Sequence, residues 1–244
     1  MKKLLALSAF VNVALAVGLW LSWRVLLTER AREADGGNLT VDRPVRILPV
    51  HTMKTRQRSP SPAKARILET ADRLFYLDGI RAVGIDRIIA EAGVAKMTLY
   101  SYFPSKDDLI TAVLRYREER VLEFFRASME RHGRRTRDKL RAFFAALEEW
   151  FEAPGFRGCA FQNAAVELAD PAHSGTLFVR DHKKRFARIL RDIVEEALGA
   201  KAAKSTPAIL LLVEGAIVTA VIHGSSEAAG IARDAALKLV EERA

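Results

Sequence analysis

The sequence has one cysteine, Cys159, among its 244 residues. A single thiol excludes a framework of intramolecular disulfides and any zinc site built from several cysteines, and it is typical of a protein in the reducing cytosol. The chain also lacks sustained alternation of β-branched residues and any repeat of fixed period, which are the signatures of sheets and of repeat proteins. From Ala63 onward the apolar spacing is helical almost throughout, so we predict an all-α fold.

Catalytic and metal-binding patterns are absent from the sequence as well. Cys159 has no recognisable orienting residue or oxyanion motif, and the spacing of Glu167, His173 and His182 matches no known set of metal ligands. We therefore expect no enzyme activity, no catalytic residues, no cofactor and no metal site. A thiol-dependent enzyme, in which His173 or His182 activates Cys159, stays open as an alternative.

The sequence has fewer acidic than basic residues. The chain has 39 lysine and arginine residues against 30 aspartate and glutamate residues, which gives a net charge of +9 at pH 7. A positive surface attracts polyanions, either a nucleic acid or an anionic membrane. The charge alone does not choose between these two partners.

Residues 59–120 contain three short apolar patterns with helical spacing, followed by a longer one. The first pattern ends at Gly79, the second covers Ile85–Ala92 and ends at Gly93, and the third ends at Pro104. Two short helices joined by a turn that contains glycine form a helix-turn-helix, whose second helix is short enough to enter the major groove of DNA.

The string GVAKMTLYSYFPSKDDL at Gly93–Leu109, preceded by GIDRIIAEA at Gly84–Ala92, resembles the tetracycline-repressor (TetR) family of transcriptional regulators. The resemblance is strong over about Ser61–Glu119. It implies a three-helix DNA-binding domain at residues 59–120 and a helical ligand-binding and dimerisation domain at residues 121–244. It also implies three partners: a double-stranded DNA operator, a second copy of the chain and an unidentified small-molecule effector.

The resemblance implies that Lys96, Thr98, Tyr100 and Tyr102 meet DNA, and that Lys106 holds a phosphate at the start of the next helix. The side of the recognition helix opposite Leu99 and Phe103 is the one best placed to read bases. For the two tyrosines the alternative is packing within the small domain, and for the two lysines it is an ordinary solvated charge. The predicted DNA-binding residues are Ala95, Lys96, Met97, Thr98, Tyr100, Ser101, Tyr102 and Lys106.

An aromatic stripe at helical spacing follows between about Thr136 and Ala153. Such a stripe is interpreted as core first and as the wall of a ligand pocket second. The next segment, GFRGCAFQNAAVELADPAHSG, resembles the linker and pocket-side helix of one TetR subgroup. The candidate pocket residues are Trp150, Phe156, Cys159, Phe161, Asn163 and Glu167.

Ala208–Ile222 is apolar on nearly every face, and we predict a buried helix that is too short to cross a membrane comfortably. A second apolar helix, Ala228–Val240, follows it. Two such helices from each of two chains would close a four-helix bundle, as in TetR dimers. The predicted dimer interface consists of Ile209, Leu212, Gly215, Ala216 and Ala220.

The N-terminal residues 1–28 form an apolar segment, and residues 29–58 are interpreted as a linker. Residues 4–23 satisfy the length of about 20 apolar residues that a membrane-spanning helix needs. One interpretation is a membrane-tethered DNA-binding sensor. The other is that translation begins at Met53, which leaves a cytoplasmic protein associated with the nucleoid. An export signal fits poorly with a DNA-binding domain, and this favours the second interpretation.

Overall fold

A computed structural model describes residues 61–133 and 135–241, and every regular element in these ranges is a helix, which confirms the all-α prediction. The predictions for the apolar segment 1–28, the membrane span at 4–23 and the linker 29–58 lie outside the described residues. The elements are α2 (Pro62–Asp78), α3 (Ile85–Ala92), α4 (Lys96–Tyr102), α5 (Lys106–His132), the 3₁₀ turn η1 (Thr136–Asp138), α6 (Lys139–Glu152), α7 (Ala160–Leu168), α8 (Ser174–Leu198), α9 (Ala200–Ala203), α10 (Thr206–His223) and α11 (Glu227–Glu241).

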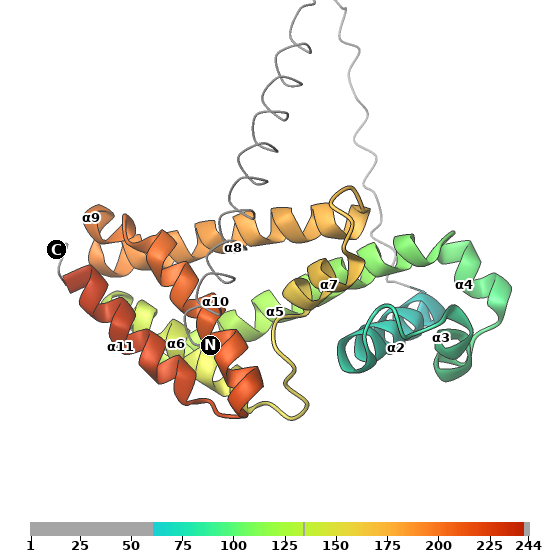
Figure 1. Cartoon of the computed structure of the whole chain (residues 1–244), viewed down its shortest axis with the longest axis horizontal. Helices are drawn as coiled ribbons and strands as arrows, with labels where there is room; N and C mark the ends of the chain where they lie inside the picture. Colours follow the sequence, from blue (N-terminus) through green and yellow to red (C-terminus); the bar gives the residue numbers. More distant parts are fainter. Residues whose placement is uncertain (1–60, 134, 242–244) are drawn as a thin grey trace, which may run out of the picture. The chain divides into compact units, whose positions relative to one another are not determined.

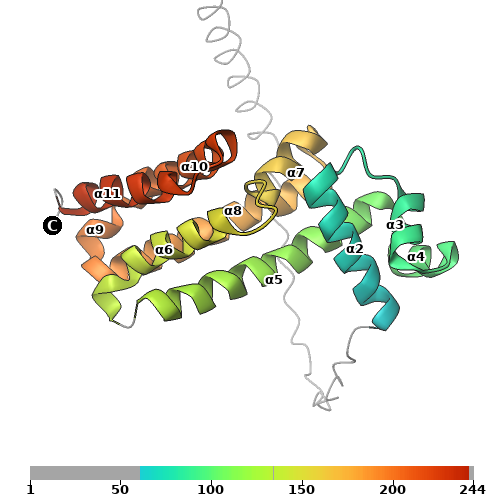
Figure 2. The same ribbon diagram turned by 90° about the horizontal axis from the view of Figure 1, so that it is seen from below.

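The described helices belong to one compact unit, with α2, α3 and α4 at one end and α10 and α11 at the other (Figures 1 and 2). The long helix α5 connects the two ends, since it packs against α2 as well as against α6 and α8. It runs without a break through residue 120, the predicted limit between two domains. Any displacement along α5 is therefore carried directly from one end to the other.

The helix-turn-helix forms where the sequence predicts it. Gly93 ends α3 in the left-handed conformation, with φ of 61°, and its N–H donates to the carbonyls of Ile89 and Ala90. A residue without a β-carbon adopts this conformation at little cost, so glycine makes the sharp turn into α4. Ile88 from α3 and Leu99 from α4 are fully buried in the core of this end. Their burial, rather than helix propensity, holds two such short helices in place.

Helix α5 begins with a capping box. The Ser105 hydroxyl accepts from the N–H of Asp108, and the Asp108 carboxylate accepts from the N–H of Ser105. Asp107 and Asp108 also place negative charge at the positive end of the helix dipole. The chain therefore starts α5 at a defined residue directly after α4.

The aromatic stripe of α6 is core, as predicted. Phe143 and Phe144 are almost completely buried, and Phe143 stacks on Phe125 of α5 with ring centroids 5.7 Å apart. Phe143 also approaches Phe186 of α8, at 6.1 Å. Three helices, α5, α6 and α8, thus share one aromatic layer.

Helix α10 departs from the prediction of a buried helix over Ala208–Ile222. It is longer, with 18 residues from Thr206 to His223, and only one face is buried. Leu211 is 75% exposed and Ile222 is 71% exposed. Among the described residues, α10 is the one helix whose length and mean hydropathy of 1.8 meet the requirements for a membrane span, a test that core helices of soluble proteins also pass. A single protomer supplies neighbours for one side of this helix only, so its complete burial between two chains stays a prediction.

Candidate functional site

The outward face of α4 is formed by Ala95, Lys96, Met97, Tyr100 and Ser101, all of which are exposed. Met97 is 77% exposed, which is unusual for a large apolar side chain. The opposite face contains the buried Leu99 and is followed by the buried Phe103. A seven-residue helix that presents one free side and anchors the other has the geometry of a helix that enters a groove.

Two predicted DNA-binding residues, Tyr102 and Lys106, are half-buried and form hydrogen bonds within the protein. The Tyr102 hydroxyl donates to Ser61 Oγ over 2.8 Å and ties the end of α4 to the start of α2. Lys106 Nζ donates to the carbonyl of Ile80 over 2.7 Å, and burial lowers the pKa of this amine. Thr98 is half-buried, and its carbonyl accepts from the Ser101 hydroxyl. These hydrogen bonds stabilise α4 and its connections to α2 and α5 on the side away from its exposed face.

Charged residues hold α3 beside α2 and in front of α4. Glu91 accepts hydrogen bonds from Arg73 and Arg87, which hold the pKa of its carboxyl below the usual range. Arg87 also pairs with Asp78 at 2.8 Å. Lys96, at the start of α4, approaches Asp86 at 3.5 Å while both side chains remain exposed. The Lys96 ammonium group therefore stays accessible to a phosphate.

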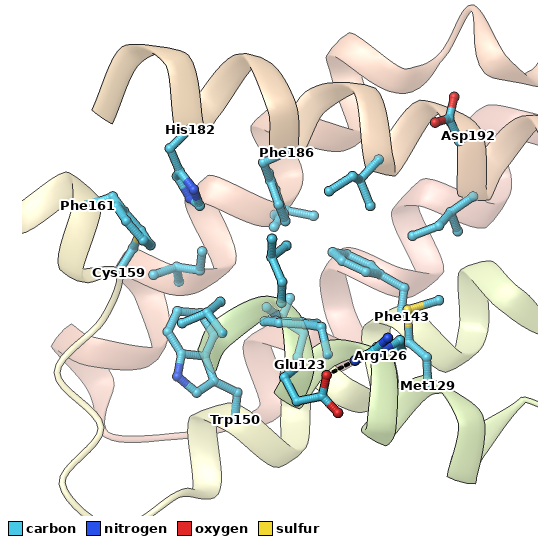
Figure 3. Close-up of a pocket in the computed structure, with 18 of the residues that line it drawn as sticks. Glu123, Arg126, Met129, Phe143, Trp150, Cys159, Phe161, His182, Phe186 and Asp192 are labelled. Carbon is cyan, nitrogen blue, oxygen red and sulfur yellow. Dashed lines mark ion pairs between the residues drawn. The ribbon is translucent and has the colours of Figure 1, made fainter. Parts of the chain in front are cut away.

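A second candidate site is a pocket of about 800 Å³ enclosed by α5, α6, α8 and α10, with the first residues of α7 at one end. In Figure 3, His182 of α8 lies beside Phe161, Phe186 lies further along the same helix, and Trp150 lies on the other side of the pocket. This volume and the apolar wall are typical of a small-molecule site.

The structure brings together three of the six predicted pocket residues, Trp150, Cys159 and Phe161, at the α7 end of the pocket. The other three lie outside it. Phe156 packs on Trp150 with ring centroids 5.1 Å apart, and Asn163 Nδ2 donates to the carbonyl of Arg157. Glu167 accepts from the backbone N–H of Arg81, in the loop between α2 and α3.

Polar groups gather at the same end of the pocket. The Glu118 carboxylate lies 2.8 Å from His182 Nδ1 and also from Arg185 Nη2. An ionised carboxylate only accepts, so we assign the hydrogen on Nδ1 of His182. The His182 ring stacks on Phe161 at a centroid distance of 3.6 Å. Burial lowers the pKa of His182 more than Glu118 raises it, so the imidazole is neutral near pH 7.

The polar neighbour of the Cys159 thiol is a lysine. Lys183 Nζ lies 3.6 Å from Cys159 Sγ and forms an ion pair of 2.6 Å with Glu214 of α10. Gln162 donates to the same carboxylate. The histidines proposed as possible bases are bonded elsewhere, His182 to Glu118 and His173 to Asp107.

Helix α7 connects the pocket to the helix-turn-helix. Its first residues line the pocket, and Glu167 near its end bonds to Arg81. The Tyr76 hydroxyl of α2 donates to the carbonyl of Gly158 and accepts from the N–H of Arg157, at 3.0 and 2.8 Å. These contacts join the segment before α7 to the end of α2.

Sequence reasoning missed the pocket residues of α5 and α8, among them Phe125, Met129, Phe186 and Ile189. Their helical spacing marks an apolar face, but spacing does not reveal which helices surround a shared space. It also missed the contacts of α7 with α2 and with the loop before α3, because they join residues 81 to 86 positions apart. No local pattern encodes such a separation.

Comparisons with known proteins agree with this geometry. Residues 67–113 match the family described as bacterial regulatory proteins, tetR family. The chain is 31% identical to a TetR-family transcriptional regulator from Streptomyces coelicolor of known crystal structure, with a TM-score of 0.66 over 75% of this chain and 96% of that one.

Curated relatives match over a shorter region. An HTH-type transcriptional regulator of Bacillus subtilis is 36% identical over 73 residues, which are 30% of this chain and 38% of that protein. An HTH-type transcriptional repressor of Streptomyces coelicolor is 41% identical over 66 residues, which are 27% of this chain and 33% of that protein. The matched region thus spans well under half of either relative.

Proposed function

The chain belongs to the TetR family of transcriptional regulators, and we propose that it binds duplex DNA as a homodimer whose affinity for an operator depends on a small molecule in the pocket. The single observation that carries this proposal is the free outward face of α4, which presents Lys96, Met97 and Tyr100 opposite the buried Leu99. We propose that it acts in the cytoplasm, where a DNA-binding regulator meets the nucleoid.

The outward residues divide the recognition of DNA between them. Lys96 and Tyr100 supply an ammonium group and a hydroxyl, which are common donors to phosphate oxygens. Ala95, Met97 and Ser101 are directed to base edges, where apolar side chains contact thymine methyl groups and hydroxyls bond to several bases. Tyr102 and Lys106 act indirectly, since their bonds to Ser61 and Ile80 hold α4 and α5 in place.

The homodimer is closed by α10 and α11. Leu211, Gly215, Val218 and Ile222 fall on one exposed face of α10, and Ile231 of α11 is 70% exposed. Of the residues predicted for the interface, Ile209, Ala216 and Ala220 are covered by the protomer's own core, Leu212 is half-buried and Gly215 is exposed. The proposed contact is therefore made by the exposed face. A dimer of this kind sets two recognition helices about 34 Å apart, one turn of DNA.

The pocket is coupled to DNA binding through α7. A molecule that displaces Cys159 or Phe161 at the start of this helix also moves Glu167, which holds the loop between α2 and α3. A ligand with different affinities for the two arrangements shifts their populations and hence the affinity for DNA.

The DNA-binding surface is tested with a duplex selected from a randomised pool by the wild-type protein. Replacing Lys96→Ala together with Tyr100→Phe removes two phosphate donors and should lower the affinity in a gel-shift titration by about tenfold or more. The matched control is Lys184→Ala, which removes the same charge from an exposed site on α8. Equal affinities of the double variant and the wild type would contradict the proposed surface.

A further inference from the structure

The pocket between α5 and α8 is long as well as apolar. It extends along α8 from His182 to Glu196, which corresponds to about 20 Å at the rise of an α-helix. Aromatic rings follow one another along it, from Phe161 through His182 and Phe186 to Phe143. A ligand in this space lies against ring faces, which carry partial negative charge.

Every positively charged group that lines the pocket, among the described residues, is already paired with a carboxylate. Lys183 pairs with Glu214 of α10, and Arg117 pairs with Asp72 of α2. The other two pairs are Arg126 with Glu123 and Lys139 with Glu196. The described wall thus offers an anionic ligand no unpaired cation.

Three further carboxylates of the lining, those of Glu119, Glu130 and Asp192, have no ion pair within residues 61–133 and 135–241. They come from α5 and α8, the two helices that flank the long axis of the pocket. Each of the four lysine and arginine side chains of the lining forms an ion pair with a different carboxylate. The charges of Glu119, Glu130 and Asp192 are therefore not neutralised by any cation of the described lining. The local sign is opposite to that of the whole chain, whose net charge is +9.

We propose that the pocket takes an aromatic organic cation. The rings provide faces for cation–π contact, the three carboxylates attract positive charge to the pocket, and no unpaired cation of the described lining opposes it. This inference rests on the proposed function in taking the pocket as the effector site. It adds the chemical class of the effector.

The class is tested with two dyes that share a xanthene skeleton and differ in charge, the cation rhodamine 6G and the anion fluorescein. Fluorescence anisotropy of each dye is followed during titration with the full chain. Rhodamine 6G should bind at least about tenfold more tightly than fluorescein, because the carboxylates attract one dye and repel the other. Its affinity should fall as NaCl rises from about 0.05 to about 0.5 M, because exposed charges are screened.

The carboxylates are tested by a triple variant, Glu119→Gln with Glu130→Gln and Asp192→Asn, which preserves shape and removes charge. It should lose about tenfold in affinity for rhodamine 6G and should bind fluorescein more tightly. The matched control removes three exposed acids outside the pocket, Glu69→Gln with Asp170→Asn and Glu241→Gln, and should behave as the wild type. Circular dichroism verifies that both variants are folded.

Two results would overturn the proposal: no binding of rhodamine 6G up to about 100 μM, which corresponds to a binding free energy of about −5.5 kcal/mol, or equal affinity of the triple variant and the wild type. A gel shift in the same solutions separates this failure from failure of the proposed function. Dye binding that leaves DNA affinity unchanged supports the ligand class and contradicts the effector response. If the protein binds DNA but does not bind rhodamine 6G, the proposed ligand class is contradicted and the proposed function is not.

Discussion

His182 is buried in the wall of the pocket and touches residues of two other helices. Its imidazole bonds to Glu118 of α5 and stacks on Phe161 of α7. Burial lowers the pKa of His182, and the hydrogen bond to Glu118 only partly offsets this. For Glu118 burial raises the pKa, but the bonds from His182 and Arg185 outweigh it and the net pKa is lowered. At low pH the His182 ring therefore gains a second N–H donor and a positive charge, in surroundings that favour the neutral ring.

The pKa of His182 predicts how stability depends on pH. Because the pKa is lower in the folded state, the unfolded chain binds more protons below about pH 6.5, and the free energy of unfolding should fall as the pH decreases through this window. In His182→Asn the amide replaces the Nδ1–H donor without titrating. Urea unfolding at about pH 7.5 and about pH 5.5 should therefore show a smaller difference in the variant.

The control for this experiment is His223→Asn, which replaces an exposed imidazole at the end of α10 and leaves His182 in place. It should retain the pH dependence of the wild type. A difference between the two pH values that persists unchanged in His182→Asn would show that another group is responsible.

The turn between α3 and α4 depends on the conformation of one residue, Gly93. A β-carbon at this position would meet no atom within 4 Å, so the left-handed backbone alone sets the cost of a side chain. Gly230 differs, since it lies inside α11 without a positive φ, and a β-carbon there would approach only the side chain of Arg233. The same substitution therefore has opposite consequences at the two glycines.

Gly93→Ala should lower the free energy of unfolding by about 1–2 kcal/mol, the cost of the left-handed conformation for an L-residue. Gly230→Ala should raise it by up to about 1 kcal/mol, because alanine is the better helix former. Chemical denaturation monitored by circular dichroism measures both. Equal stability of Gly93→Ala and the wild type would mean that the turn has another conformation.

Within residues 61–133 and 135–241, an extended apolar surface is uncovered at the end opposite the helix-turn-helix. It follows α10 through Leu211, Val218 and Ile222. Large apolar surfaces on soluble proteins mark interaction sites, and a twofold contact buries the same face of both copies. The mean hydropathy of α10 is thus consistent with the dimer helix proposed above.

Val218→Glu places a charge at the centre of this face and should convert the dimer to monomers, because a buried unpaired carboxylate is strongly unfavourable. Val166→Glu is the matched control, since Val166 of α7 is 78% exposed against 48% for Val218. Light scattering gives the mass of each variant. A dimeric Val218→Glu protein would place the interface elsewhere, and a monomeric Val166→Glu protein would extend it to α7.

The sequence by itself determined the helices, the position of the helix-turn-helix and the family. These follow from apolar spacing, from Gly93 and from the cap at Ser105, whose effects reach only a few residues along the chain. The match over residues 67–113 and the relative at 31% identity confirm the family resemblance.

Only the tertiary structure decided where several side chains point. Tyr102 bonds to a residue 41 positions away and Lys106 to one 26 positions away, and the motif does not reveal either contact. The tertiary structure also decided which helices enclose the pocket and which face of α10 is left free. The physical reason is that burial and hydrogen bonding depend on neighbours brought together by folding, which the periodicity of a single helix does not specify.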